Sequence, residues 1–340
     1  MSRIVIVTSH LGYGHFTRQL GLAKELLDIG HSVNLVCDSE KIQVFPNPFT
    51  SNFQFIESPP MPSFVFDGHI LDLETTRYTF QTMLNFETQV RDDRQWDRIL
   101  EGADLVINDI ESYHNPIVKK FRMPVLNISN FTWSDLLYHV GLNEIGDQIA
   151  ELEGLADMSI QLPFNTSCKS FGQVESMGLM LRTLEEVVSK THSILIKELP
   201  NFVKFSLSDL LTHLNSEGWQ VFVANTLDTS QIPSNVEYHV LNNSDYYLKQ
   251  LAKAEIYIGK IGYSTLAECA YYGTRLLFWI REGNMEDLSL RDSVYSYGMG
   301  ELMVPTLNKV NEQIKKLERT KFERFENSTR KIAERVAEFL

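Results

Sequence analysis

The sequence predicts an α/β protein made of two doubly wound halves, and three observations lead to this prediction. Short apolar runs, typical of strands buried in parallel sheets, alternate with helical patterns along most of the chain. The alternation is interrupted between Gln161 and Arg182, where small polar residues replace any clear period. With 340 residues, the chain also exceeds the size at which a single hydrophobic core usually stops growing. Two domains are therefore expected.

The first half opens with a strand, a helix and a second strand. Arg3–Ser9 is a continuous apolar run, a glycine-punctuated loop follows it, and a helical pattern then extends to Gly30. Ser32–Cys37 is the next predicted strand. This order places His15 in the loop after the first strand, at the edge where open α/β sheets bind their ligands.

The remainder of the first half continues the alternation. Strands are predicted at Gln54–Glu57, Ala103–Asn108 and Pro124–Ile128, and helices at Leu71–Leu100, around Val118 and from Asp135. The Pro-rich segment Ser58–Phe66 is not expected to be regular, because proline removes a backbone donor. The charge run Arg91–Arg94, inside the long helical pattern, is interpreted as a solvated helix face.

The second half repeats the same organisation. Strands are predicted at Ser193–Ile196, Gln220–Ala224, Tyr238–Leu241, Ile256–Ile258 and Arg275–Ile280, with helices at Leu207–Asn215 and Asp245–Ala252. The last segment, Asn308–Leu340, carries charges of both signs and apolar residues at helical intervals. It is predicted to be an amphipathic helix packed on the body of the protein.

A candidate anion site lies in the second half, where the strand Ile256–Ile258 runs into a glycine turn. Gly262 gives the turn its freedom, and Ser264 or Thr265 is expected to open the next helix. A helix N-terminus presents unpaired N–H groups with roughly half a positive charge, and Lys260 lies on the approach. The pattern therefore predicts a phosphate-binding site.

Glu268 follows Thr265 by three residues, and this spacing leaves two roles open. The carboxylate either closes a capping box with Thr265 or accepts hydrogen bonds from the hydroxyls of a ribose. The polar loop Arg281–Asp287 follows the next predicted strand. Loops at the carboxyl ends of neighbouring parallel strands share one crevice, so this loop and the glycine turn are expected to bind one ligand.

Composition limits the possible partners. The net charge of −13 opposes general binding to nucleic acids or anionic membranes, both of which attract basic surfaces. A small anionic ligand remains compatible with this charge, because a local nest of N–H groups acts at short range.

The chain also lacks the usual signals for membranes and for oxidising compartments. No stretch approaches the ~20 apolar residues of a membrane helix, and the N-terminal apolar run is too short for a secretory signal. A cytoplasmic protein is therefore expected. Cys37, Cys168 and Cys269 have neither disulfide-framework nor zinc-site spacing and are expected to be buried, inert thiols.

Three motifs give the chain a resemblance to known families. They are YGHFTR at Tyr13–Arg18, the run from INDIE to SNFTWSDLLY at Ile107–Tyr138, and GKIGYSTLAE with REGNMEDLSLR at Gly259–Arg291. Together with the two doubly wound halves, they resemble the GT-B glycosyltransferases, and more closely the glycosyltransferase-like N-terminal region of plant L-arabinokinases. YGH-x-x-R and GYST-x-x-E also resemble nucleotide-sugar hydrolases related to the peptidoglycan N-acetylglucosaminyltransferase.

The resemblance implies a GT-B fold, in which two Rossmann-like domains face each other across a cleft. Residues 1–165 would form the acceptor domain, 166–185 the linker, 186–317 the nucleotide-sugar donor domain, and 318–340 a helix packed on the body. The implied activity is transfer of a sugar from a nucleotide diphosphate, with UDP the expected nucleotide, to an unidentified acceptor. The nucleotide sugar is the substrate, and no cofactor is expected.

The resemblance also implies roles for individual residues. Gly262, Ser264 and Thr265 would contact phosphate, and Glu268 would contact the ribose. The other implied nucleotide or phosphate contacts are Gly14, Arg18, Lys260 and Tyr263, and the implied donor-sugar contacts are Arg281, Glu286 and Asp287. The alternative interpretation of Arg18 is a surface residue. Related proteins commonly have a glycine-rich loop that also contacts the phosphates, and Lys197 is a candidate to replace it in this chain.

Sugar transfer needs a base for the incoming hydroxyl, and His15 is the predicted base. An unperturbed imidazole has a pKa of about 6.5 and is mostly neutral at cytosolic pH. His10 is the alternative base. Asp109 or Glu111, after the strand Ala103–Asn108, would orient the imidazole, and the alternative role for both carboxylates is a helix N-cap.

The expected chemistry needs no metal. No Asp-x-Asp motif occurs in a strand-end loop, so helix N-termini, hydroxyls and cationic side chains are expected to stabilise the diphosphate instead. Two other functions remain open. Arg18 in GH-x-x-R favours a nucleotide-sugar hydrolase, and the third possibility is a sugar-nucleotide-binding protein without catalysis.

Overall fold

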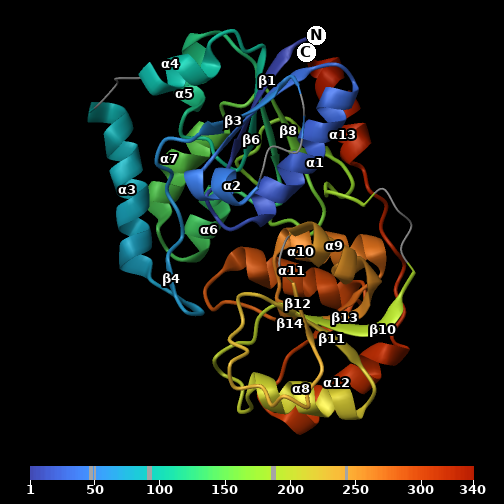
Figure 1. Ribbon diagram of the computed structural model, residues 1–340. Coiled ribbons are helices and arrows are strands. Elements are labelled where there is room, and N and C mark those ends of the chain that lie inside the picture. Colours follow the sequence, from blue (N-terminus) through green and yellow to red (C-terminus); the bar gives the residue numbers. More distant parts are fainter. Residues whose placement is uncertain (46–48, 50, 90–93, 185–188, 242–243) are drawn as a thin grey trace. The chain divides into compact units, whose positions relative to one another are not determined.

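The computed structural model describes residues 1–45, 49, 51–89, 94–184, 189–241 and 244–340 (Figure 1). Within these residues the chain forms two compact units. The first comprises residues 1–182, 282–286 and 327–340, and the second comprises residues 183–281 and 287–326. The expected α/β class with two doubly wound halves is confirmed, since each unit has its own parallel sheet flanked by helices.

The first unit is built on a parallel sheet with the strand order β3-β2-β1-β6-β7-β8-β9. Its strands are β1 (Arg3–Thr8), β2 (Ser32–Cys37), β3 (Phe53–Glu57), β6 (Leu105–Asp109), β7 (Val125–Ser129), β8 (Met158–Gln161) and β9 (Val174–Ser176). A short antiparallel hairpin, β4 (Phe66–Asp67) with β5 (Ile70–Leu71), follows the Pro-rich segment. The order reverses between β1 and β6, which is where doubly wound sheets bind ligands.

Helices cover both faces of this sheet (Figure 1). They are α1 (Gly14–Asp28), α2 (Ser39–Val44), α3 (Leu73–Gln89), α4 (Arg94–Leu100), α5 (Asn115–Lys120), α6 (Trp133–His139), α7 (Asn143–Glu153) and α13 (Thr329–Phe339). The apolar run of β1 is buried because helices lie against both of its faces. On one face, Val5 and Val7 pack with Trp96 of α4 and Val118 of α5.

The second unit has the parallel strand order β12-β11-β10-β13-β14-β15. Its strands are β10 (Thr191–Ile196), β11 (Gln220–Ala224), β12 (His239–Leu241), β13 (Ala254–Lys260), β14 (Arg275–Trp279) and β15 (Gly300–Leu302). Its helices are α8 (Leu207–Ser216), α9 (Ser244–Lys253), α10 (Tyr263–Tyr272), α11 (Met285–Ser296) and α12 (Leu307–Arg319). Leu210 of α8 and Ile314 of α12 pack with Ile194 and Ile258 in one core, while α9 and α10 lie on the opposite face of the sheet (Figure 1).

The expected boundary at residues 165 and 166 differs from the structure, in which the first unit continues to Arg182. The reason is a set of contacts that the local pattern does not reveal. Asp135 accepts hydrogen bonds from Thr166 Oγ1 at 2.7 Å, Ser167 Oγ at 2.8 Å and the backbone N–H of Cys168 at 2.6 Å. The following strand β9 then pairs with β8. Residues 185–188 of the expected linker lie outside the described residues.

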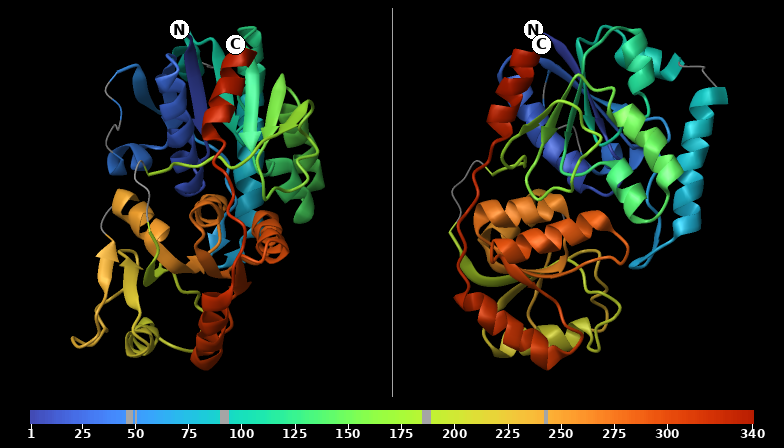
Figure 2. Two further views of the ribbon diagram at one scale, coloured as in Figure 1. Left: turned by 90° about the vertical axis from the view of Figure 1, so that its right-hand side faces the viewer. Right: turned by 180° about the vertical axis from the view of Figure 1, so that it is seen from behind.

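The expectation for the last helix also needs correction. The single helix expected over residues 318–340 is divided, because α12 ends at Arg319 in the second unit and the chain resumes a helix only at Thr329. That last helix, α13, lies beside α1 in the first unit (Figure 1 and Figure 2). The helix expected at 71–100 is described as α3 and α4, and residues 91–93 of the charge run Arg91–Arg94 lie outside the described residues.

Membrane insertion through a helix finds no support in the described part of the chain. None of its helices combines the length and the hydropathy that crossing a bilayer requires.

Candidate functional site

His15 and Asp109 form the centre of the candidate site in the first unit. His15 lies in the first turn of α1, and Asp109 is the last residue of β6, paired in register with Thr8 of β1. Because β1 and β6 are adjacent, their carboxyl ends bring the two side chains together. His15 Nδ1 lies 2.8 Å from Asp109 Oδ1, and the exposed fractions of the two residues are 6% and 0%.

Arg18 belongs to the same buried group, and its expected contact with phosphate stays a prediction. It is 1% exposed, so it is not a surface residue. Its guanidinium donates to Asp109 through Nε at 2.7 Å and through Nη2, and Nη2 also lies 3.0 Å from Nδ1 of His15. The cation is thus committed to the carboxylate beside the histidine. Burial opposes the charge of Asp109, but the Arg18 and His15 partners hold the pKa of that carboxyl well below its usual range.

Asn130 and Gln19 also belong to this buried group, and neither was predicted from the sequence to lie in it. Asn130, directly after β7, accepts from Arg18 Nη1 at 2.8 Å and donates through Nδ2 to Glu286 Oε1 at 3.2 Å. Gln19 donates to Asp109 Oδ2 at 3.0 Å. The position of Asn130 at a strand end was a usable signal, whereas nothing in the pattern around Gln19 points to Asp109.

Of the two carboxylates expected to orient His15, the structure places Asp109 in contact with it and not Glu111. Glu111 is fully buried, and burial raises its pKa to about 8. The alternative role as helix N-caps is wrong for both, because α5 is capped by His114. Between them, Ile110 adopts φ +62°, a strained value for a β-branched residue and one that turns the chain sharply at the strand end.

His10, the alternative base, has a different environment. Its Nε2 lies 2.5 Å from Ser58 Oγ, and burial lowers the pKa of the imidazole. No hydrogen bond joins it to a carboxylate in the described residues. The ring of His15 instead packs edge-on against Phe131, with 5.6 Å between ring centroids, and Phe131 packs on Trp133. An aromatic ring therefore covers one side of the His15 imidazole.

The glycine turn of the second unit has the predicted strand-turn-helix form, with a shift of the helix start. Gly262, not Ser264 or Thr265, is the N-cap, and α10 begins at Tyr263. No side chain caps this end and no acidic residue occupies the first turn. The first N–H groups of α10 therefore have no intrahelical acceptor, as an anion site requires.

The earlier helix start settles one alternative for Glu268. A capping box pairs the N-cap with the residue three positions later, which is Thr265 when Gly262 is the N-cap. Glu268 lies three residues beyond that, so it is not the partner in a capping box. It is 6% exposed, and its carboxylate interacts electrostatically with Lys197, the residue after β10.

The hydroxyls and glycines of the turn differ in accessibility. Ser264 is half-buried, whereas Tyr263 and Thr265 are buried.

At Gly259 an added Cβ would lie 2.6 Å from the hydroxyl oxygen of Tyr257, so the residue must be glycine for the strand end to pack. In the first unit, Gly14 is half-buried at the start of α1.

Lys260, Arg281 and Asp287 come together in the second unit. The buried carboxylate of Asp287 pairs with Arg281 Nη2 at 2.9 Å and with Lys260 Nζ at 3.2 Å. The backbone N–H of Arg281 also donates to Asp287 at 2.9 Å. Asp287 thus holds two cations in place. Glu286, its neighbour in α11, packs within the first unit, where it is 5% exposed.

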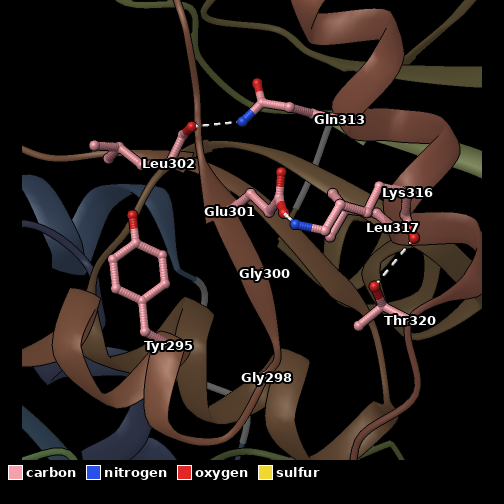
Figure 3. Close-up of a pocket in the computed structure, with 9 residues that line it drawn as sticks. All are labelled: Tyr295, Gly298, Gly300, Glu301, Leu302, Gln313, Lys316, Leu317 and Thr320. Atoms are coloured by element: carbon pink, nitrogen blue, oxygen red, sulfur yellow. Dashed lines mark hydrogen bonds and ion pairs between the residues drawn. The ribbon is translucent and has the colours of Figure 1, made fainter.

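A separate pocket of about 500 Å³ lies in the second unit along the edge strand β15 (Figure 3). Within it, Lys316 contacts Glu301, and Gln313 donates to the carbonyl of Leu302. None of the predicted site residues lines this pocket.

No group of three or more His, Cys, Asp or Glu side chains with the geometry of a metal site occurs among the described residues. Metal independence nevertheless remains a prediction, since the diphosphate of a substrate also supplies metal ligands.

Comparison with solved structures identifies the fold as that of the GT-B glycosyltransferases. UGT2 of Phytolacca americana, solved with UDP-2-fluoro-glucose and pterostilbene, matches 100% of this chain and 99% of its own, with a TM-score of 0.65 and 12% identity. CalG4, the calicheamicin glycosyltransferase, matches 99% of this chain and 94% of its own, with a TM-score of 0.62 and 15% identity.

Sequence comparison gives a weak match to one curated protein. No protein-family model matches the chain. An L-arabinokinase of Arabidopsis thaliana is 23% identical over 316 residues, which cover 88% of this chain. The matched region is 30% of the length of that curated relative. This match agrees with the resemblance seen in the motifs.

Proposed function

We propose that the protein transfers a sugar from a nucleotide diphosphate, UDP-linked, to an acceptor hydroxyl without a metal ion. The observation that carries the proposal is the contact of 2.8 Å between His15 Nδ1 and Asp109 Oδ1 at the carboxyl edge of the first sheet. The GT-B fold supports it, and the UDP sugar bound by the Phytolacca enzyme is the model for the donor.

His15 acts in this proposal as the general base. Asp109 accepts a hydrogen bond from Nδ1–H of His15, and in this tautomer the lone pair of Nε2 is available for the proton of the acceptor hydroxyl. As that proton moves to Nε2, the acceptor oxygen bonds to the anomeric carbon, and the bond from this carbon to the diphosphate oxygen breaks. UDP leaves with the electron pair of that bond.

The leaving diphosphate is stabilised by the second unit. The uncapped N-terminus of α10 supplies backbone N–H groups, and Ser264 adds a half-buried hydroxyl. Lys260 and Arg281, both held by Asp287, supply positive charge. Glu268 is proposed to bind the ribose hydroxyls, the role left open once the capping box is ruled out.

Hydrolysis of the nucleotide sugar is the second candidate function. It uses the same base with water in place of the acceptor. The burial of His15 favours it, because a side chain that is 6% exposed and walled by Phe131 is more accessible to water than to a bulky acceptor. A protein that only binds the nucleotide sugar is the third candidate.

One experiment separates these functions. The purified protein is incubated with a panel of UDP sugars, with and without a cell extract as the source of acceptor, and UDP and free sugar are measured. UDP release that requires the extract supports transfer, free sugar without extract supports hydrolysis, and binding without turnover supports the third candidate. His15→Asn should lower the turnover by about 10²–10⁴-fold, the usual contribution of a positioned base. Unchanged turnover in His15→Asn contradicts the assignment of the base.

Treatment with a chelator tests whether turnover is independent of a metal ion. Turnover in the presence of excess EDTA should equal turnover without it, because the proposed site neutralises the diphosphate with N–H groups and cations. Loss of turnover that magnesium or manganese restores overturns this part of the proposal.

A further inference from the structure

A tyrosine of β13 lies beneath the glycine turn of the second unit. Ile256 and Ile258 pack in the core that α8 and α12 cover, so Tyr257 between them faces the opposite side of the sheet, where α9 and α10 lie. Its side chain is fully buried. Burial raises the pKa of Tyr257 well above its usual value, so the hydroxyl keeps its proton and acts as a hydrogen-bond donor.

The acceptor of this hydroxyl is the backbone carbonyl of Lys260, at 3.1 Å. On the same side of β13, the N–H of Lys197 donates to the carbonyl of Ile258 at 2.9 Å, and the neighbouring strand β10 has ended at Ile196. The carbonyl of Lys260 lies two residues further along that side, so its partner has to come from outside the ladder of strands. Tyr257 supplies this partner.

Gly259 leaves the space that the hydroxyl occupies. Residues 257 and 259 lie on the same face of the strand, because side chains alternate between the two faces. A Cβ at position 259 would lie 2.6 Å from the hydroxyl oxygen of Tyr257 and 2.9 Å from its Cζ. The glycine and the tyrosine therefore belong together: without a side chain at 259, the ring extends to the end of the strand.

The same hydroxyl connects the two ends of the turn. It donates to Lys260, where the turn begins, and it forms a side-chain hydrogen bond with Thr265 in the first turn of α10. Gly262 lies between these residues as the N-cap and has no side chain to cap the helix. Tyr257 thus holds the backbone that carries the first N–H groups of α10.

We propose that Tyr257 is a positioning residue that fixes the glycine turn, through Lys260 and Thr265, with the N–H groups of α10 held ready for a diphosphate. It does not contact the diphosphate, because it is fully buried. A turn that is ordered before the ligand arrives lowers the entropic cost of binding. The role in nucleotide binding rests on the proposed function, whereas the fixing of the turn is a property of the second unit alone.

The binding test compares UDP, measured by calorimetry, with uridine, measured by ligand-observed NMR. Tyr257→Phe removes only the hydroxyl and should raise the Kd for UDP by about 3- to 10-fold, the usual value of one hydrogen bond. Uridine has no diphosphate, so its Kd should change less than about twofold. Tyr247→Phe is the matched control, because this hydroxyl of α9 also interacts with Thr265 but makes no hydrogen bond to the carbonyl of Lys260. It should bind UDP as the wild type does.

Hydrogen exchange tests the turn without any ligand. The N–H of Ile261 donates to the carbonyl of Trp279 at 3.0 Å, and the N–H of Leu266 donates to the carbonyl of Gly262 at 2.9 Å, so both amides report opening of the turn. In Tyr257→Phe they should exchange about 3- to 10-fold faster. The amides of the core strand β11 should exchange as in the wild type, because they report unfolding of the whole unit.

Gly259→Ala is a second variant that disturbs the same contact, since the added Cβ displaces the ring. It should raise the Kd for UDP, and the further change Tyr257→Phe should raise it little more, because the hydroxyl has already lost its place. Unchanged exchange at Ile261 and Leu266 in Tyr257→Phe, or equal losses of affinity for UDP and uridine, overturns the proposal. If the wild type binds no UDP, the proposed function fails, while the exchange rates still decide the role of Tyr257.

Discussion

Asp287 and Arg281 form a two-pronged ion pair, in which Arg281 Nε donates to Oδ2 at 3.0 Å and Nη2 donates to Oδ1 at 2.9 Å. The carboxylate is buried, and Lys260 Nζ approaches it to 3.2 Å. One residue of α11 therefore organises two cations at the ends of β13 and β14. The pair is a structural element whatever ligand the second unit binds.

Asp287→Asn should lower the free energy of unfolding at pH 7 by about 1.5–3 kcal/mol, the usual value for hydrogen bonds to a charged group. Burial acts to raise the pKa of Asp287, but Lys260 and Arg281 outweigh it and hold this pKa below its usual range. A depressed pKa means that the stabilisation is present at neutral pH and is lost as the pH falls through the folded-state value.

Urea denaturation at several pH values measures both effects. The difference in stability between wild type and Asp287→Asn should be largest near neutral pH and shrink below about pH 4. A difference that grows on acidification contradicts the assigned pairing.

Glu268→Ala should weaken UDP binding by about 1–3 kcal/mol, because hydrogen bonds to a charged group are lost. Isothermal titration calorimetry with UDP measures this as a higher Kd. Glu217→Gln, an exposed carboxylate at the end of α8, is the matched control and should bind UDP as the wild type does. Equal affinity in wild type and Glu268→Ala removes Glu268 from the nucleotide site.

Glu111→Gln should change how stability depends on pH. Burial raises the pKa of Glu111 to about 8, so the folded state keeps a proton that the unfolded chain releases. The resulting stabilisation is present below the unfolded-state pKa and is lost as the pH rises towards 8.

The glutamine variant has no such proton, so its stability relative to the wild type should increase between pH 5 and pH 8. The slope should approach about 1.4 kcal/mol per pH unit at most. Denaturation midpoints across this range measure it, and Glu144→Gln, on the exposed part of α7, should show no comparable trend. Parallel stability profiles of wild type and Glu111→Gln would show that Glu111 is ionised in the fold.

Asp135→Ala should expose Cys168 to thiol reagents. Asp135 accepts from the backbone of Cys168 at 2.6 Å and from Thr166 and Ser167, and Cys168 is 3% exposed. Loss of these contacts should raise the population of the opened segment, and with it the labelling rate, by about 10-fold or more. DTNB kinetics measure this. Labelling of Asp135→Ala/Cys168→Ser should be as slow as that of the wild type, because Cys37 and Cys269 stay buried.

The strands were the most predictable part of the fold. Ser32–Cys37 and Gln220–Ala224 coincide with β2 and β11, because an apolar run bounded by polar residues has few other places to lie than the interior of a sheet. Val174–Ser176 was not predicted as a strand. It is a short edge strand with little burial, and Asp135 fixes the segment that leads into it through contacts distant in sequence.

The site was predictable at the level of strand ends and not at the level of side-chain partners. The sequence predicted that His15 and Asp109 both follow strands of the first sheet, and the structure shows that the two side chains are in contact. It could not show that Arg18 turns inward to Asp109, because a helix residue has several possible neighbours. Helix α10 begins at Tyr263, before the predicted Ser264 or Thr265, because glycine is also accepted at the N-cap and Gly262 occupies it.

The return of the chain to the first unit has a consequence for protein engineering. Because α13 completes the layer beside α1, the second unit is an insertion into the first rather than its successor. A chimera with a foreign second half therefore needs junctions near residues 182 and 327, and two more on either side of Glu282–Glu286 to retain that segment of the first unit. A fusion with one junction would remove α13, with its buried Ile332 and Val336, and would expose the surface of α1 beside which α13 lies.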